Sequence, residues 1–175
     1  DNPERIFDIN TFFSEPQFFY RFHKAFLTAL DQVEPTFAHR FFAALEEQGS
    51  LVGIVTQNID SLHQRAGSEK VLEIHGGIWD TYCTECKRPV DFETSHRLTM
   101  EQEVPSCEHC GGVLKPDIVF FGESVKHLGE CQQLMESADL LFVVGSSLVV
   151  TPAAILPSLS SGPIVVVNIG EASPL

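Results

Sequence analysis

The sequence predicts an α/β protein whose core is a doubly wound parallel sheet. Three apolar runs rich in β-branched residues, at 51–56, 140–145 and 164–168, are typical of parallel strands covered on both faces. Helical segments are expected between them, at 124–138 and 152–159, which gives the alternating order of such a sheet. With 175 residues, 43% of them hydrophobic, the chain can bury one ordinary core.

Two helices are expected before the first of these strands. In the first, Ser14 can cap the amino end and Pro16 suits the first turn. Its apolar residues recur at every fourth position and indicate a buried face formed by Phe18, Phe22, Phe26 and Leu30. The second helix spans 35–48, Gly49 can end it, and its apolar side consists of Phe37, Phe41, Ala44 and Leu45. We expect these phenylalanines to lie in the core, and a further short strand is possible at 71–75.

The segment 78–114 departs from this alternation and is predicted to be an inserted module. It holds two CxxC motifs, separated by twenty residues, whose four thiolates can complete the tetrahedral shell that zinc prefers: Cys83, Cys86, Cys107 and Cys110. Since sulfur takes all four positions, one structural zinc per chain is predicted, with no position open for water. The alternatives are chance pairs or two disulfides, and His109 could replace one ligand. Cys131 is expected to be a buried small hydrophobe.

Small and polar residues follow each predicted strand, where ligands gather in a doubly wound sheet. The run TQNIDSLH at 56–63 can bind a sugar and an amide, or form an Asx turn for purely structural reasons. His75, followed by two glycines, is a candidate general base, because a neutral imidazole suits proton transfer near pH 7. The turn at 145–148 suits a phosphate or ribose. The segment 115–123 could offer an extended edge to a peptide, or could simply be a strand that leaves the module.

Taken in order, these motifs resemble one family, the sirtuins. The matching stretches are TQNIDSLH, IHGG, the paired CxxC knuckles, KPDIVFFGE, GSSLVVTPA and VNIGE, and the resemblance spans residues 3–175. It implies a Rossmann-like NAD-binding domain at 1–77 and 115–175 that carries a small helical module, with a zinc ribbon at 78–114. NAD and an acyl-lysine peptide would meet in the cleft between them.

The resemblance also implies roles for individual residues. His75 looks like the general base, with Asn58 and Asp60 as contacts to the ribose and amide. The positions that match NAD contacts are Gln57, Asn58, Ile59, Asp60, His75, Gly145, Ser146, Ser147, Asn168 and Gly170. Those that match the walls of the peptide and acyl-lysine channel are Val119, Phe120, Phe121, Gly122, Glu123 and Val150, where the substrate would add as a strand.

The reaction implied by the resemblance consumes NAD as a co-substrate. The acyl oxygen attacks the ribose carbon as nicotinamide leaves, and His75 then removes a proton from a ribose hydroxyl so that this hydroxyl can attack the imidate. Free lysine, nicotinamide and O-acyl-ADP-ribose result. A protein ADP-ribosyltransferase and an inactive zinc-ribbon binding module are the alternatives. The family's opening strand and glycine-alanine-glycine phosphate loop are expected before Asp1.

The charge of the chain bears on its partners. Lys and Arg number 11 against 24 Asp and Glu, so the formal net charge is -13 and direct binding of nucleic acid is unfavourable. An acidic surface would suit lysine-rich peptides, although it could merely confer solubility. The absence of a long apolar run and the cysteine usage favour an intracellular, cytoplasmic protein without membrane contact, with the nucleus as an alternative.

The first helix bears on the choice of acyl group. Sirtuins specialised for succinyl or malonyl groups resemble one another in a Tyr and an Arg three residues apart, and alignment on Pro16 and Phe22 places His23 and Phe26 there. Neither offers a guanidinium to a carboxylate, so acetyl and longer apolar acyl groups are expected as substrates. Alternatively, both side chains simply pack within the helical module.

Overall fold

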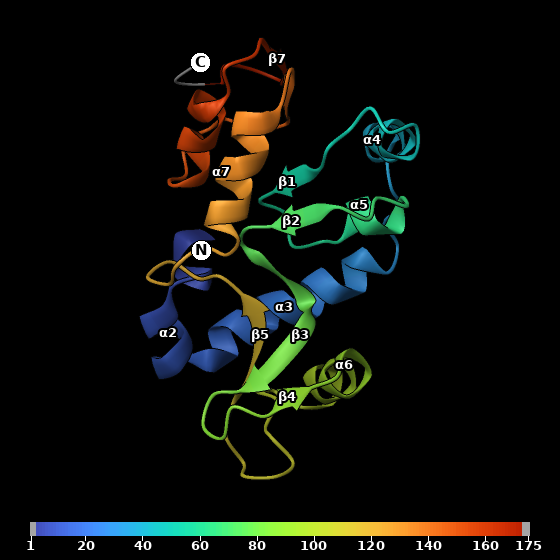
Figure 1. Cartoon of the computed structure of the whole chain (residues 1–175). Coiled ribbons are helices and arrows are strands. Elements are labelled where there is room, and N and C mark those ends of the chain that lie inside the picture. Colours follow the sequence, from blue (N-terminus) through green and yellow to red (C-terminus); the bar gives the residue numbers. More distant parts are fainter. Residues whose placement is uncertain (1–2, 173–175) are drawn as a thin grey trace. The chain divides into compact units, whose positions relative to one another are not determined.

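The computed structural model describes residues 3–172, which form two compact units (Figure 1). Within the described residues, the first unit comprises 3–36, 58–62 and 75–124, and the second comprises 37–57, 63–74 and 125–172. Among the described helices, none combines the length and apolar character needed to cross a bilayer.

The first unit combines helices with a small antiparallel sheet. Its strands pair in the order β4-β3-β5. Its elements are α1 (Pro3–Ile6), α2 (Ile9–Ser14), α3 (Pro16–Leu30), β3 (Gly76–Cys83), β4 (Pro89–Val90), α6 (Phe92–Glu101) and β5 (Leu114–Ile118). Its main core joins α2 and α3 to the sheet and contains Phe12, Phe19, Tyr20, Leu27, Ile78, Ile118 and Phe120. The segment 3–36 therefore packs against the strands that flank the zinc module. The domain boundaries expected from the sequence stay a prediction.

Helix α3 buries a different face from the expected one. The buried residues are Phe19, Tyr20, His23 and Leu27, while Phe18, Phe22, Phe26 and Leu30 are only partly buried. Both faces of the helix are aromatic, so the four-residue repeat could not distinguish them. Within the first unit, Tyr20 fixes the choice, because its hydroxyl donates a hydrogen bond to the buried Leu114 carbonyl of β5.

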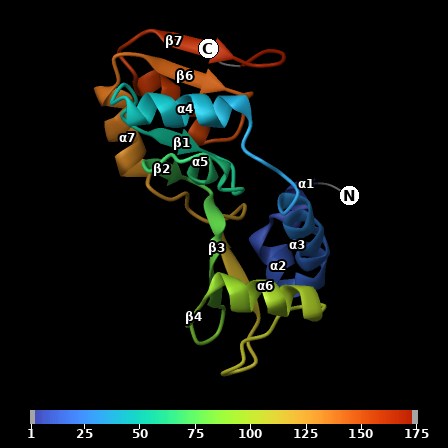
Figure 2. The same ribbon diagram turned by 90° about the vertical axis from the view of Figure 1, so that its right-hand side faces the viewer.

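The second unit has strands with helices on both faces. Its elements are α4 (Phe37–Glu47), β1 (Ile54–Thr56), α5 (Leu62–Arg65), which starts in the first unit, β2 (Val71–Glu73), α7 (Leu128–Ser137), β6 (Leu141–Val144), the 3-10 helix η1 (Ala153–Leu159) and β7 (Ile164–Val167). β1 pairs with β2 and β6 with β7, both in parallel. Leu141 packs against the core formed with α7 and η1, and its neighbour Phe142 meets Phe42 of α4. Helix α4 lies beside strand β6 (Figure 2). Successive residues of a strand point to opposite faces, so this arrangement confirms the doubly wound character.

Three expectations about this unit are corrected. Phe37 and Phe41 are 77% and 40% exposed, because α4 packs through Phe42, and the two exposed rings stack on each other instead. Strand β7 is also largely exposed from Val165 to Val167, since β6 is its only strand partner among residues 3–172. The segment expected to be helical at 152–159 forms a 3-10 helix, consistent with Pro157 inside it.

Candidate functional site

Two knuckles of the first unit carry the four cysteines. Cys83 ends β3, and the N–H of Lys87 donates to its carbonyl over 3.0 Å. The second knuckle closes in the same way, because the N–H of Gly111 donates to the carbonyl of Cys107 over 2.8 Å. Lys87 and Gly111 both adopt positive φ, 59° and 78°, which turns the chain back sharply after each CxxC.

The sulfur atoms converge as a zinc site requires. The four Sγ atoms lie within 4.8 Å of one another, with Cys83 to Cys110 at 3.4 Å and Cys86 to Cys107 at 3.9 Å. Zn–S bonds of about 2.3 Å in a tetrahedron place sulfurs roughly 3.8 Å apart, so these spacings fit the ion. Gly112 is required beside them, because a Cβ there would lie 2.9 Å from the Cys83 sulfur. Within residues 3–172 this is the only group of three or more potential ligand side chains placed to share a metal.

The thiols of this cluster affect one another's protonation. Burial raises the pKa of Cys83, but the N–H groups of Cys86 and Glu85 outweigh it and hold that pKa at about 7. The N–H of Gly112 lowers the pKa of Cys110, while the surrounding thiols raise it to about 11. Neighbouring thiolates repel, so all four can be deprotonated together only when a dication compensates their charge.

His75 directly precedes β3, and a hydrogen bond to its main-chain carbonyl fixes its position. Its carbonyl accepts the N–H of Val119 over 2.8 Å, which places it next to the segment expected to bind peptide. Gly76, which follows, has a φ of 69°, and a Cβ there would lie 1.8 Å from the Asp117 carbonyl oxygen. Only glycine therefore permits this approach of β3 and β5. The imidazole itself is half-buried, so it is not enclosed in the core.

The peptide segment, 119–123, is held by the first unit in ways the sequence did not indicate. Phe120 is 1% exposed and lies in the core, whereas Phe121 is 50% exposed. The N–H of Phe121 donates to the Phe7 carbonyl over 2.7 Å, and its carbonyl accepts the N–H of Ile9 over 3.2 Å. The Phe121 side chain and the remaining main-chain groups of the segment stay available for contacts, whereas peptide binding by this segment stays a prediction.

The NID sequence after β1 has a clear structural role. Asp60 Oδ1 accepts the N–H of Leu62 over 3.0 Å in an Asx turn, and Ile59 packs against the main core of the first unit. The next residue, Ser61, accepts a hydrogen bond from the indole N–H of Trp79. These contacts fix the backbone around Asn58, whose contact with ribose or amide stays a prediction.

The remaining candidate NAD contacts lie in the second unit, at the carboxyl ends of its strands. Val144 pairs with Val167, and the N–H of Gly145 donates to the Val167 carbonyl over 2.9 Å, so β6 and β7 end together. Gln57 Nε2 donates to Ser146 Oγ over 3.4 Å and brings the end of β1 to the same edge. The other predicted residues of this unit follow the same strands or precede η1: Ser147, Val150, Asn168 and Gly170.

The backbone at this edge fits a bound phosphate or ribose. Gly145 and Gly170 have φ values of 62° and 95°, and a Cβ on either would meet no atom within 4 Å. Open space beside two glycines allows a ligand to approach the main chain, and the Ser146 hydroxyl can bond to it.

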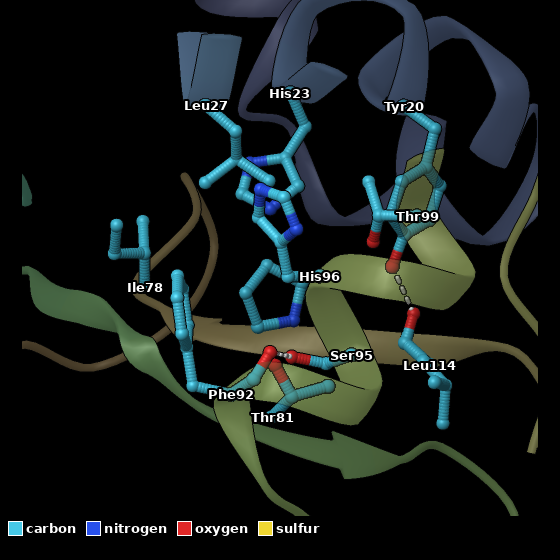
Figure 3. Close-up of a pocket in the computed structure, with 11 residues that line it drawn as sticks. Tyr20, His23, Leu27, Ile78, Thr81, Phe92, Ser95, His96, Thr99 and Leu114 are labelled. Atoms are coloured by element: carbon cyan, nitrogen blue, oxygen red, sulfur yellow. Dashed lines mark hydrogen bonds between the residues drawn. The ribbon is translucent and has the colours of Figure 1, made fainter. Parts of the chain in front are cut away.

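Sequence reasoning missed a cavity between α3 and α6 (Figure 3). His23 points into it, stacks on Phe19 with ring centres 5.0 Å apart, and has no hydrogen-bond partner for Nδ1 among the described residues. Burial, with a smaller contribution from His96, lowers the pKa of His23 to about 4. His23 is therefore packed within the first unit, as the alternative interpretation expected, Phe26 is partly buried, and the acyl preference stays a prediction. The spacing of Tyr20, His23 and Leu27 was the available signal.

Comparison with known proteins agrees with these features. The sequence model of the Sir2 family matches residues 1–152. The NAD-dependent protein deacetylase of Thermotoga maritima is 44% identical over 173 residues, which cover 96% of this chain and 70% of that protein. A solved Sir2 complex with p53 peptide and NAD+ superposes with a TM-score of 0.90 at 44% identity, covering 95% of this chain and 72% of the other. A Sir2 protein bound to a propionylated peptide gives a TM-score of 0.91 at 43% identity, with 97% and 74% covered.

Proposed function

Because the chain belongs to the Sir2 family, we propose that it is an NAD-dependent protein lysine deacylase that removes acetyl or other apolar acyl groups. The structural observation that carries this function is the bond from the Val119 N–H to the His75 carbonyl, which holds the candidate base beside the candidate peptide segment. The products are nicotinamide, free lysine and O-acyl-ADP-ribose.

The roles of the residues follow from their chemistry. NAD supplies the electrophilic ribose carbon that receives the acyl oxygen as nicotinamide leaves. A ring nitrogen of His75 takes the proton of a ribose hydroxyl, and the half-buried imidazole is accessible for this transfer. Asn58 orients the ribose and amide, with Asp60 fixing the turn beside it. The open backbone at Gly145 and Gly170 receives the phosphates and adenosine.

Zinc has a structural role in this proposal. The four thiolates of Cys83, Cys86, Cys107 and Cys110 hold one ion and leave no position for a substrate. We also place the protein within the cell, in the cytoplasm first and the nucleus as the alternative, because four reduced cysteines persist in a reducing compartment.

The test is to incubate the full-length protein with an acetyl-lysine peptide and NAD and to follow all products by mass spectrometry. Nicotinamide, deacetylated peptide and O-acetyl-ADP-ribose are expected in equal amounts. Label from NAD that appears on protein without deacetylation would instead identify an ADP-ribosyltransferase. No turnover by zinc-loaded, folded protein would leave only a binding module.

The acyl preference gives a sharper expectation for the same enzyme. The side chains proposed to line the channel, Val119, Phe121 and Val150, are apolar and cannot pair with a carboxylate. A succinyl group would therefore lose its hydration without compensation, and we expect its kcat/KM to be at least about tenfold below that of the matched acetyl-lysine peptide. Equal or faster turnover of the succinyl peptide would contradict this preference.

A further inference from the structure

Lys115 is a charged side chain that the first unit buries and that the proposed reaction does not use. It is 2% exposed and is the second residue of β5, which is an edge strand of the three-stranded sheet. Its Nζ donates to the Ile118 carbonyl over 2.8 Å and to Glu123 Oε2 over 3.0 Å, and lies 4.3 Å from the centre of the Phe120 ring. A buried ammonium group is unfavourable unless it is paired. These contacts therefore constrain the backbone path of the residues that follow β5.

The same carboxylate also holds the main chain of the peptide segment. Glu123 Oε2 accepts the N–H of Phe120 over 2.9 Å, in addition to Lys115. The ammonium and carboxylate thus join the end of β5 to the end of segment 119–123. Val119, inside this closed stretch, donates to the carbonyl of His75. This ion pair, whose lysine is buried and whose carboxylate is partly exposed, thus adds to the main-chain hydrogen bonds of Val119 and Phe121 in fixing the path of the segment.

We propose that Lys115, acting through Glu123, is a positioning residue that holds segment 119–123 in the shape that receives the acyl-lysine peptide. The inference rests on the proposed deacylase function and revises the role of Glu123, whose carboxylate binds Lys115 and the Phe120 N–H and so contributes to peptide binding indirectly. If the pair only stabilised the fold, its loss would reduce stability without changing peptide affinity in the folded protein.

Steady-state kinetics of Lys115→Met, Lys115→Arg and a control variant distinguish these roles. Lys115→Met should raise the KM for an acetyl-lysine peptide about tenfold, the usual effect of losing a charged hydrogen bond, while kcat and the KM for NAD change less than about threefold. Lys115→Arg should recover most of the peptide KM, because a guanidinium also donates to both acceptors. Arg97→Met, which removes two exposed ion pairs, of 3.1 Å to Glu101 and of 3.0 Å to Glu108, should match the unaltered protein.

Lys115→Met leaves the Glu123 carboxylate without its cation, so the double variant Lys115→Met with Glu123→Gln is prepared as well. Removing both charges of a buried pair usually preserves folding, and the double variant should show the same increase in peptide KM. A folded variant whose peptide KM stays within twofold overturns the proposal, and so does failure of both variants to fold. Fluorescence anisotropy of a labelled acetyl-lysine peptide measures affinity without turnover, so the test separates this inference from the deacylase function itself.

Discussion

Gly76 allows the close approach of β3 and β5 next to the candidate base. It follows His75, pairs with Ile118 across β3 and β5, and lies so close to β5 that a Cβ would overlap the Asp117 carbonyl oxygen. The close approach lets Val119 reach the His75 carbonyl. A backbone position thus sets the distance between the candidate base and the peptide segment.

Replacing this glycine should be costly. Gly76→Ala combines a left-handed backbone at φ 69° with a Cβ placed 1.8 Å from a carbonyl oxygen. We expect it to lower the free energy of unfolding by about 3 kcal/mol, measured by urea denaturation. Gly49→Ala is the matched control, since its φ is 72° and its Cβ would meet no atom within 4 Å. The control should cost about 1 kcal/mol, and equal losses would show that the overlap is relieved.

Removing the candidate base should affect catalysis and little else. His75→Ala is expected to lower kcat by about 10²–10⁴-fold on an acetyl-lysine peptide with saturating NAD, the usual effect of losing a general base. The side chain is half-buried and the hydrogen bond from Val119 is made to its main chain, so the thermal unfolding temperature should change by only a few degrees. Near-normal turnover would exclude the proposed role.

Helix α3 shows what a sequence pattern can and cannot predict about one element. Pro16 in the first turn was a local signal, and the structure confirms the helix. Ser14, the expected cap, instead ends α2, and Glu15 occupies the cap position of α3. The buried face depends instead on contacts with α6 and β5, which lie far along the chain, and Tyr20 and His23 on that face are polar. A polar residue is expected to be exposed until its surroundings are known, so the spacing of Tyr20, His23 and Leu27 could not by itself favour this face over the phenylalanine face.

The buried imidazole in α3 should make stability depend on pH. Burial lowers the pKa of His23 from 6.5 to about 4, so the unfolded chain takes up this proton at a higher pH than the folded one. The free energy of unfolding is unaffected above about pH 6.5 and decreases as the pH falls towards 4, with a loss of about 2 kcal/mol at pH 5 from this group.

The variant His23→Leu isolates that contribution from the carboxylates, which also titrate in acid. Urea denaturation at pH 7.5 and pH 5 is measured for both proteins. The difference between the two pH values should be about 2 kcal/mol smaller for the variant. The same difference in both proteins would mean that His23 is protonated as readily in the folded state.

Across the whole molecule, the local sites could be predicted from the sequence, whereas the packing of distant segments could not. Cysteines three residues apart form a knuckle within a few residues, so the zinc site follows from local geometry. Polar residues after β1, β6 and β7 were also predictable, because parallel strands of a doubly wound sheet present their carboxyl ends together. The packing of residues 3–36 with 75–124 was not predictable, since it depends on aromatic contacts between distant segments, such as that of Phe12 with Phe120.

The division into two units predicts how the protein responds to loss of zinc. The small core around Cys83, Leu98, Cys107 and Leu114 lies in the first unit, whereas the second unit has a separate core. Without the ion, the four Zn–S bonds are lost and four polar thiols remain close together. The surrounding hydrophobic core is too small to keep the knuckles folded by itself. Chelation should therefore speed amide exchange by about a hundredfold or more at the N–H of Cys107, which bonds to the Gly112 carbonyl over 2.8 Å.

The second unit should remain folded in the same experiment. Amide exchange between β6 and β7, followed at the N–H of Gly145, should change by less than about threefold. Cys107→Ser should reproduce the pattern without chelator, while Cys131→Ala, in the core of the second unit, should keep one zinc per chain and leave the knuckles protected. A uniform increase in amide exchange across both units would show that they unfold as one cooperative body. Well-folded protein that contains no zinc would refute the metal site. The candidate base and the candidate peptide segment both belong to the first unit. Unfolding around the empty zinc site would therefore lower activity, although the ion itself takes no part in the reaction.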